Sequence, residues 1–164
     1  MNKIIPYGKH FIDDDDIKAV IDVLKHKNLT QGAEVESFEH AVADFVGAKY
    51  AVAMSSWTAG LHMACLAAGV SKGDKVVTSP ITFVASANAA IYCNAKPIFA
   101  DIESETINID HQSLESLIES TPDTKAIIPV HYAGLACNMK EIRAIANRSN
   151  SIVIEDAAHA LGAK

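Results

Sequence analysis

The segment Ser151-Ile-Val-Ile-Glu-Asp-Ala-Ala-His159 decides the fold. Its β-branched apolar run is typical of a buried parallel strand, and the run stops at two carboxylates. Asp156 is therefore expected at the C-terminal edge of a sheet, which is where ligands bind in open α/β sheets. His159 follows three residues later. A carboxylate at such a place can also cap a helix, which is the commoner role for a segment of this kind taken alone.

Apolar runs alternate with helical stretches from Tyr50 to the end of the chain. The expected strands are 50–54, 75–79, 96–100, 125–130 and 151–155, and the expected helices are 58–69, 83–93, 111–120 and 138–148. Asp110 and Asn138 are expected to cap two of these helices. Strands that alternate with helices of about a dozen residues predict an α/β fold with a mainly parallel sheet.

Residues 1–47 show a different pattern and are expected to form an N-terminal helical arm, ahead of an α/β domain at 48–164. The first helix is predicted at 13–27, where apolar residues recur on one face. The acidic run that opens it is interpreted as a helix start rather than a metal site, because negative charge is favourable at a helix N-terminus. A second amphipathic helix follows a short loop and ends at Gly47.

The composition argues against several classes of protein. The 164 residues are 49% hydrophobic and 21% charged, which is typical of a soluble globular protein. A net charge of -6 and scattered basic residues argue against a nucleic-acid partner. No apolar run suits a membrane span or a signal peptide, so the expected location is cytoplasmic. The three cysteines lie far apart and the histidines lack ligand spacing, so neither disulfides nor a metal site are expected.

Two further segments could complete a binding site at the same sheet edge. After the first expected strand the chain turns through Ser55, Ser56 and Trp57 and opens a helix at Thr58. The free N–H groups at such a helix start can bind phosphate, although Ser56 could simply cap the helix. Phe83 follows the next strand and could stack on an aromatic ring, although a phenylalanine at this place is more often part of the core.

Asp156 has the most specific chemical role in this set. A carboxylate that faces a pyridine nitrogen keeps that nitrogen protonated and makes the ring an electron acceptor. His159 could touch the same ring or bond to Asp156, or it could be a helix histidine packed near the sheet. His131 and Tyr132 end the fourth expected strand and could line the same crevice in a supporting role. No GxGxxG or GxxxxGK[ST] motif is present, so no nucleotide cradle of those kinds is predicted.

Taken together, these segments resemble the DegT/DnrJ/EryC1/StrS family of nucleotide-sugar aminotransferases. In family order they are Ile5 to Gly8, Asn28 to Gly32, Ser55 to Gly60, Ser79 to Ala85, Pro129 to Gly134 and Ile154 to Gly162. The resemblance covers essentially the whole chain. It implies a partial fold-type-I large domain, with an N-terminal helical arm, that binds pyridoxal 5′-phosphate.

The resemblance also implies roles for individual residues. The cofactor-binding set is Ser56, Thr58, Ala59, Phe83, Asp156 and His159. Asp156 would pair with the ring nitrogen and His159 would lie near the ring hydroxyl, which makes these two the catalytic candidates. Tyr7 and Thr30 fall in segments that approach the sugar nucleotide, and they are the substrate-binding candidates.

Within the family, the sequence is most similar to the branch of pseudaminic acid synthesis. This implies transfer of an amino group from glutamate to the 4-keto carbon of a UDP-linked 4-keto-6-deoxy-N-acetylhexosamine, by a homodimer. One alternative is a pyridoxal-phosphate-dependent sugar 3-dehydratase of the same family. Another is a non-catalytic fragment or partner subunit.

Two features depart from the family pattern. Trp57 stands where the family usually has a small residue, and its indole would crowd a bound phosphate unless it points outward. The lysine that binds the cofactor covalently lies some way beyond the Asp-x-x-His segment in the family, and Lys164 is not at that position. The chain alone is therefore expected to hold the cofactor weakly at best and to have no aminotransferase activity.

Overall fold

The computed structural model describes residues 8–163. The chain divides into two compact units, one that ends at Ala53 and one that begins at Met54. Within the described range, no helix combines the length and the apolar character needed to cross a membrane.

The first unit contains two helices, α1 (Asp14–His26) and α2 (Ala33–Val46). Asp13 caps α1 through a capping box: its carboxylate accepts from the N–H of Asp16, whose own carboxylate accepts from the N–H of Asp13. The acidic run is therefore a helix start, as predicted. α2 stops at Gly47, whose φ of 68° is the left-handed conformation that glycine tolerates best.

The strand predicted at 50–54 is not formed, and that expectation was wrong. The stretch is irregular, and the side chain of Val52 is 71% exposed. The N–H of Ala53 donates to the Glu39 carboxylate at 2.7 Å instead of to a neighbouring strand. A strand needs a partner for its backbone hydrogen bonds, and an apolar run by itself does not supply one.

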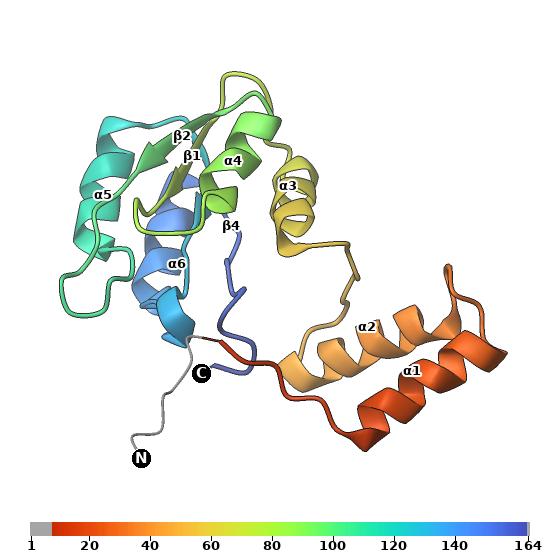
Figure 1. The fold of residues 1–164 in the computed structure, drawn as a ribbon. Coiled ribbons are helices and arrows are strands. Elements are labelled where there is room, and N and C mark those ends of the chain that lie inside the picture. Colours follow the sequence, from red (N-terminus) through yellow and green to blue (C-terminus); the bar gives the residue numbers. More distant parts are fainter. Residues whose placement is uncertain (1–7, 164) are drawn as a thin grey trace, which may run out of the picture. The chain divides into compact units, whose positions relative to one another are not determined.

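The second unit is a four-stranded parallel sheet with helices on both faces (Figure 1). Its strands are β1 (Lys75–Thr78), β2 (Lys96–Phe99), β3 (Thr124–Ile128) and β4 (Ile152–Val153), in the order β2-β1-β3-β4. Its helices are α3 (Trp57–Ala67), α4 (Ala85–Tyr92), α5 (His111–Ser120) and α6 (Met139–Ser149), with a 3-10 turn η1 (Tyr132–Gly134) after β3. These elements confirm the predicted α/β class with a parallel sheet.

Two hydrophobic clusters pack the helices against opposite faces of this sheet. In β1, Val76 belongs to the cluster formed with α3 and α4, whereas Val77 belongs to the cluster formed with α5 and α6. In β3, Ile128 belongs to the cluster with α3 and α4, and Ile127 belongs to the cluster with α5 and α6. Alternate side chains of a strand point to opposite faces, so both strands are buried on both sides. This burial explains why their sequences are continuous apolar runs.

The strand order places a topological switch between β1 and β3. From β1 the chain crosses through α4 to β2, and it then returns through α5 past β1 to β3. Because α4, which follows β1, and α6, which follows β3, pack on opposite faces, the loops after β1 and β3 diverge at the carboxyl edge of the sheet. Ligands bind in the crevice at such a point in open α/β sheets. The segments that begin at Ser79 and Pro129 leave the sheet there.

Candidate active site

A pocket of about 210 Å³ lies at this switch point of the second unit. Its walls come from the start of α3, the loop after β1, the loop after β3 and the segment after β4. Among the residues singled out from the sequence, it brings together Thr58, Phe83, His131, Tyr132, Asp156 and His159.

The backbone of Asp156 is held by the segment that follows β3. Its N–H donates to the carbonyl of Pro129 at 2.9 Å, and its carbonyl accepts from the N–H of His131 at 3.1 Å. These bonds form an isolated parallel bridge between Val130 and Asp156, beyond the end of β4. Asp156 is only 5% exposed, so a buried acid lies at the carboxyl edge of the sheet, where the sequence placed it.

Three donors contact the Asp156 carboxylate. Oδ1 accepts from Trp57 Nε1 at 2.6 Å and from the N–H of Ala158 at 3.3 Å. Oδ2 accepts from the Ser86 hydroxyl at 2.7 Å. The Thr82 hydroxyl lies 2.8 Å from Ser86 Oγ, and it is the donor because the single Ser86 proton is directed at Asp156. A buried carboxylate needs such donors, because burial without hydrogen bonds is strongly unfavourable.

Sequence reasoning missed Ser86 and Thr82 as members of this network. Ser86 is fully buried in α4, whose other buried residues are alanines. A hydroxyl on the buried side of an apolar helix indicates a polar partner, because buried polar groups are nearly always hydrogen-bonded. The sequence contains that signal, but only the fold identifies Asp156, 70 residues away, as the partner.

Trp57 points into the site rather than outward. Its indole reaches Asp156 and forms part of the pocket wall, although 43% of the residue remains exposed. The outward orientation, which an open phosphate turn would require, is therefore not the one observed. The small residue expected at this position would have left this Asp156 oxygen without its indole donor.

The start of α3 has the geometry of an anion site. Ser56 is the N-cap, and its hydroxyl accepts from the N–H of Ala59 at 3.2 Å. Ser56 thus has the capping role, and the Ala59 N–H is used by the cap. Thr58, half-buried in the first turn, faces the pocket. Helix N-termini attract anions because their first N–H groups lack helical partners, so Thr58 is the member of this set best placed for a phosphate.

Phe83 and His159 are exposed residues of the pocket wall. Phe83 is 73% exposed, so it does not belong to the core. His159 lies in a turn, so the alternative interpretation as a helix histidine was wrong. Gly134, with a φ of 89°, allows this turn to approach η1, because a Cβ there would lie 3.1 Å from the carbonyl oxygen of His159.

His131 supports the site through contacts with both of its ring nitrogens. Nδ1 accepts from the N–H of Cys137 at 3.1 Å, so the ring proton is on Nε2, which donates to Glu155 at 3.1 Å. Glu155 also accepts from Arg143 at 2.9 Å. Burial acts to raise the pKa of Glu155, but the hydrogen bonds from Arg143 and His131 outweigh it and lower that pKa. His131 is therefore a positioning residue.

Neither substrate-binding candidate is among the described residues that line this pocket. Thr30 lies in the exposed loop between α1 and α2, in the first unit. Tyr7 lies outside the described residues. Their contact with a sugar nucleotide remains a prediction.

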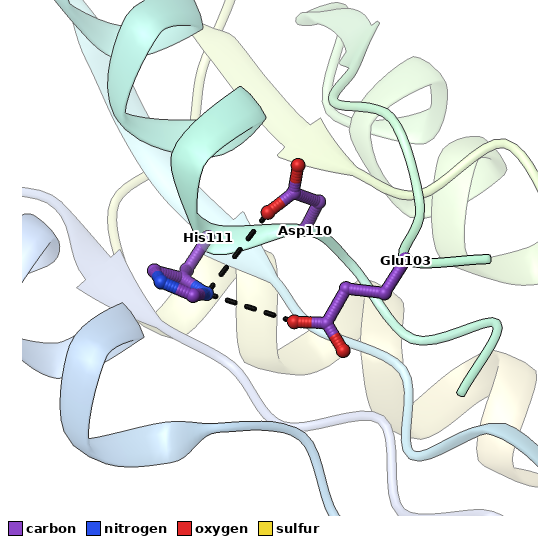
Figure 2. A group of neighbouring side chains, drawn as sticks. All are labelled: Glu103, Asp110 and His111. Atoms are coloured by element: carbon purple, nitrogen blue, oxygen red, sulfur yellow. Dashed lines mark ion pairs between the residues drawn. The ribbon is translucent and has the colours of Figure 1, made fainter. Parts of the chain in front are cut away.

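A second group of titratable side chains lies at the start of α5 (Figure 2). His111 Nδ1 is 3.6 Å from Glu103 and 4.0 Å from Asp110. Asp110 is the N-cap of α5, as predicted, and accepts from the N–H of Gln112, while Glu103 accepts from the Thr106 hydroxyl. All three members are partly exposed. We interpret the group as polar side chains that hold the loop from Glu103 to Asp110 against the start of α5.

Comparison with known proteins gives one family for almost the whole chain. The profile of the DegT/DnrJ/EryC1/StrS aminotransferase family matches residues 10–164. The spore coat polysaccharide biosynthesis protein SpsC of Bacillus subtilis is 45% identical over 160 residues, which are 98% of this chain and 41% of SpsC. The chain therefore spans about two-fifths of the length of this relative.

Solved structures agree with the sequence comparison. Helicobacter pylori PseC, an aminotransferase involved in the biosynthesis of pseudoaminic acid, matches with a TM-score of 0.87 and 35% identity over 98% of this chain and 43% of PseC. The PLP form of the putative sugar aminotransferase Spr1654 from Streptococcus pneumoniae matches with a TM-score of 0.88 and 28% identity over 96% of this chain and 44% of that chain. The parallel sheet is thus part of the fold-type-I architecture of these enzymes. This chain belongs to the DegT/DnrJ/EryC1/StrS aminotransferase family.

Proposed function

We propose that this chain supplies the cofactor-binding part of a pyridoxal-phosphate-dependent sugar aminotransferase. The observation that carries the proposal is the buried Asp156 at the topological switch point, in one pocket with the start of α3 and Phe83. Family membership supports the class of reaction, and the PLP form of the Streptococcus pneumoniae relative supports the cofactor.

The residues of the pocket suit this cofactor. Asp156 can accept a hydrogen bond from the ring nitrogen, Thr58 at the helix start can receive the phosphate, and Phe83 can cover a ring face. His159 is proposed to lie near the ring hydroxyl. When bound, pyridoxal phosphate supplies an electron-accepting ring that stabilises negative charge on the substrate carbon. Ser86 fixes the Asp156 carboxylate from the side of α4 and thereby orients it.

The described pocket wall does not contain a lysine. Transamination needs an amine that holds the cofactor covalently and moves a proton at the substrate carbon. We therefore assign binding and orientation of the cofactor to this chain, and we expect no turnover from this chain alone.

For the substrate, we propose a UDP-linked 4-keto-6-deoxy-N-acetylhexosamine that receives its amino group from glutamate at carbon 4, in a homodimeric enzyme. The similarity to PseC supports this choice, since PseC is involved in the biosynthesis of pseudoaminic acid. Tyr7 and Thr30 are the proposed contacts to the sugar nucleotide. Saturation-transfer NMR with UDP-linked and GDP-linked 4-keto-6-deoxyhexoses tests the choice, and stronger transfer to the GDP-linked sugar would contradict it.

Equilibrium dialysis with pyridoxamine 5′-phosphate tests cofactor binding without requiring a lysine. We expect saturable binding at one site per chain. Asp156→Asn should weaken binding at least tenfold, because a hydrogen bond to a charged group contributes roughly 1.5–3 kcal/mol. Met63→Ala is the control, since Met63 is a 44% exposed residue of α3 that does not line the pocket. Equal binding by wild type and Asp156→Asn, or no saturable binding, would contradict the proposal.

Borohydride reduction in the presence of pyridoxal phosphate tests the missing amine. Mass spectrometry should find no stoichiometric adduct at a single lysine. A stoichiometric adduct at one position would show that the chain carries its own cofactor lysine.

A further inference from the structure

We propose that Trp57 occupies, in the free chain, the Asp156 oxygen that the ring nitrogen of the cofactor needs, so that the cofactor must displace the indole to bind. This inference rests on the proposed function, because it concerns the same pocket. It makes Trp57 a positioning residue that sets how tightly the cofactor is held.

The hydrogen bonds of Asp156 carry the first step. Trp57 Nε1 lies 2.6 Å from Oδ1, and the N–H of Ala158 takes the second acceptor position of that oxygen at 3.3 Å. Ser86 holds Oδ2 from α4, at 2.7 Å. Since Asp156 is only 5% exposed, the indole is the donor on the pocket side of the carboxylate. A ring N–H reaches Oδ1 once the indole has left.

Gly60 explains how the indole is held in this position. A Cβ at Gly60 would lie 2.8 Å from Cε3 and 3.0 Å from Cζ3 of Trp57, so the ring rests directly on the next turn of α3. A glycine within a helix is less favourable than alanine by roughly 1 kcal/mol, and it usually has a packing reason. Here the reason is the space that the indole occupies.

The exchange of donors has a consequence for affinity. In the free chain, the indole supplies a hydrogen bond that the buried Asp156 carboxylate would otherwise lack. On binding, the charged ring N–H replaces the neutral indole N–H as a donor to the carboxylate, so the net contribution of the ring bond to affinity is reduced by the indole bond that is lost. Removing the indole N–H should therefore make cofactor binding about tenfold tighter, the size expected for one such bond.

Nitrogen-15 NMR reads this contact directly, because Trp57 is the single tryptophan of the chain and gives one indole N–H signal. In the free chain, Asp156→Asn should shift the signal and accelerate its exchange with solvent. Saturating pyridoxamine 5′-phosphate should move the wild-type signal towards that of a free indole. Inorganic phosphate should leave it in place, because phosphate occupies only the helix start.

Equilibrium dialysis with pyridoxamine 5′-phosphate supplies the second readout. Trp57→Phe keeps an aromatic ring but removes the donor, and it should bind about tenfold more tightly than wild type. Gly60→Ala keeps the tryptophan but pushes its ring off the helix, so it should change affinity in the same direction. Met63→Ala should bind as wild type does. Far-ultraviolet circular dichroism establishes that each variant is folded.

The outcomes separate this inference from the proposed function. Binding by wild type together with equal or weaker binding by Trp57→Phe would overturn the inference and leave the proposed function standing. An indole signal that ignores both Asp156→Asn and saturating pyridoxamine 5′-phosphate would do the same. Failure of wild type and all variants to bind would overturn both. Tighter binding by Trp57→Phe, with a moved indole signal in wild type, supports both.

Discussion

The two units of this chain use apolar residues in opposite ways. The second unit buries them in two clusters, one on each face of its sheet. In the first unit, α1 has no buried residue and α2 has only Ala43, although both helices are amphipathic. Phe38, for example, is 59% exposed. The difference shows that an amphipathic pattern and good caps specify a helix, whereas burial requires other elements to pack against it.

Core truncation should give the largest contrast between the units. Leu114→Ala, in α5, should lower the free energy of unfolding of the second unit by roughly 2–5 kcal/mol, because Leu114 is fully buried and its loss leaves a cavity. Phe38→Ala, in α2, should change stability by about 0.5 kcal/mol or less. Urea denaturation followed by circular dichroism measures both. A comparable loss for Phe38→Ala would show that the stripe on α2 is covered in solution.

Cysteine reactivity tests the burial of the second unit separately, because Cys65, Cys93 and Cys137 all lie in that unit. Burial raises the pKa of the Cys65 and Cys137 thiols to about 11 and also raises that of Cys93. From an ordinary value of 9.0, a rise to about 11 lowers the reactive thiolate fraction roughly 100-fold at neutral pH. Disulfide-exchange labelling should therefore be slow in the native chain and fast in urea. A thiol that reacts natively at the denatured rate would contradict this burial.

The smallest contrast concerns one carboxylate in each unit. Hydrogen bonds from His26 and Lys27 lower the pKa of Asp22, and the contacts of Glu155 described above lower its pKa below 4.5. A lowered folded-state pKa gives stability that is present above the unfolded value and is lost as pH falls through the folded value. The free energy of unfolding should therefore rise less between pH 3 and 6 in Glu155→Gln than in wild type. The difference should be at most about 1 kcal/mol, because the Glu155 side chain is partly exposed.

Salt distinguishes the two carboxylates. Asp22, whose side chain is 49% exposed, should lose its effect in 1 M salt more completely than Glu155, whose side chain is 36% exposed. Stability measured against pH at low and high salt, for Asp22→Asn and Glu155→Gln, provides the test. Equal salt sensitivity would show that the second unit does not shield its ion pair.

The sequence predicted those parts of the fold that local patterns determine. The caps at Asp110 and Asn138, the acidic start of α1 and the buried strands β1 and β3 follow from residue type and spacing. The stretch 50–54 has the same apolar character but forms no strand, because pairing depends on a partner that an apolar run does not encode.

The site was predictable in place but not in its contacts. Asp156 could be located because it is an acid that directly follows an apolar run, and a residue directly after a parallel strand lies at the carboxyl edge of the sheet. Its partners Trp57 and Ser86 come from segments 99 and 70 residues away, and the crossovers of the sheet bring them together. No local spacing encodes such a meeting, so the orientation of Trp57 required the structure.

The bridge between Val130 and Asp156 links the loop lengths of this scaffold to its chemistry. Both backbone hydrogen bonds of Asp156 go to the segment after β3. An insertion in that segment would therefore shift the Asp156 carboxylate away from Ser86, even though it would replace none of the residues that line the pocket. Redesign of specificity on this scaffold should therefore exchange the side chain at Tyr132 and keep the chain length between β3 and η1 unchanged.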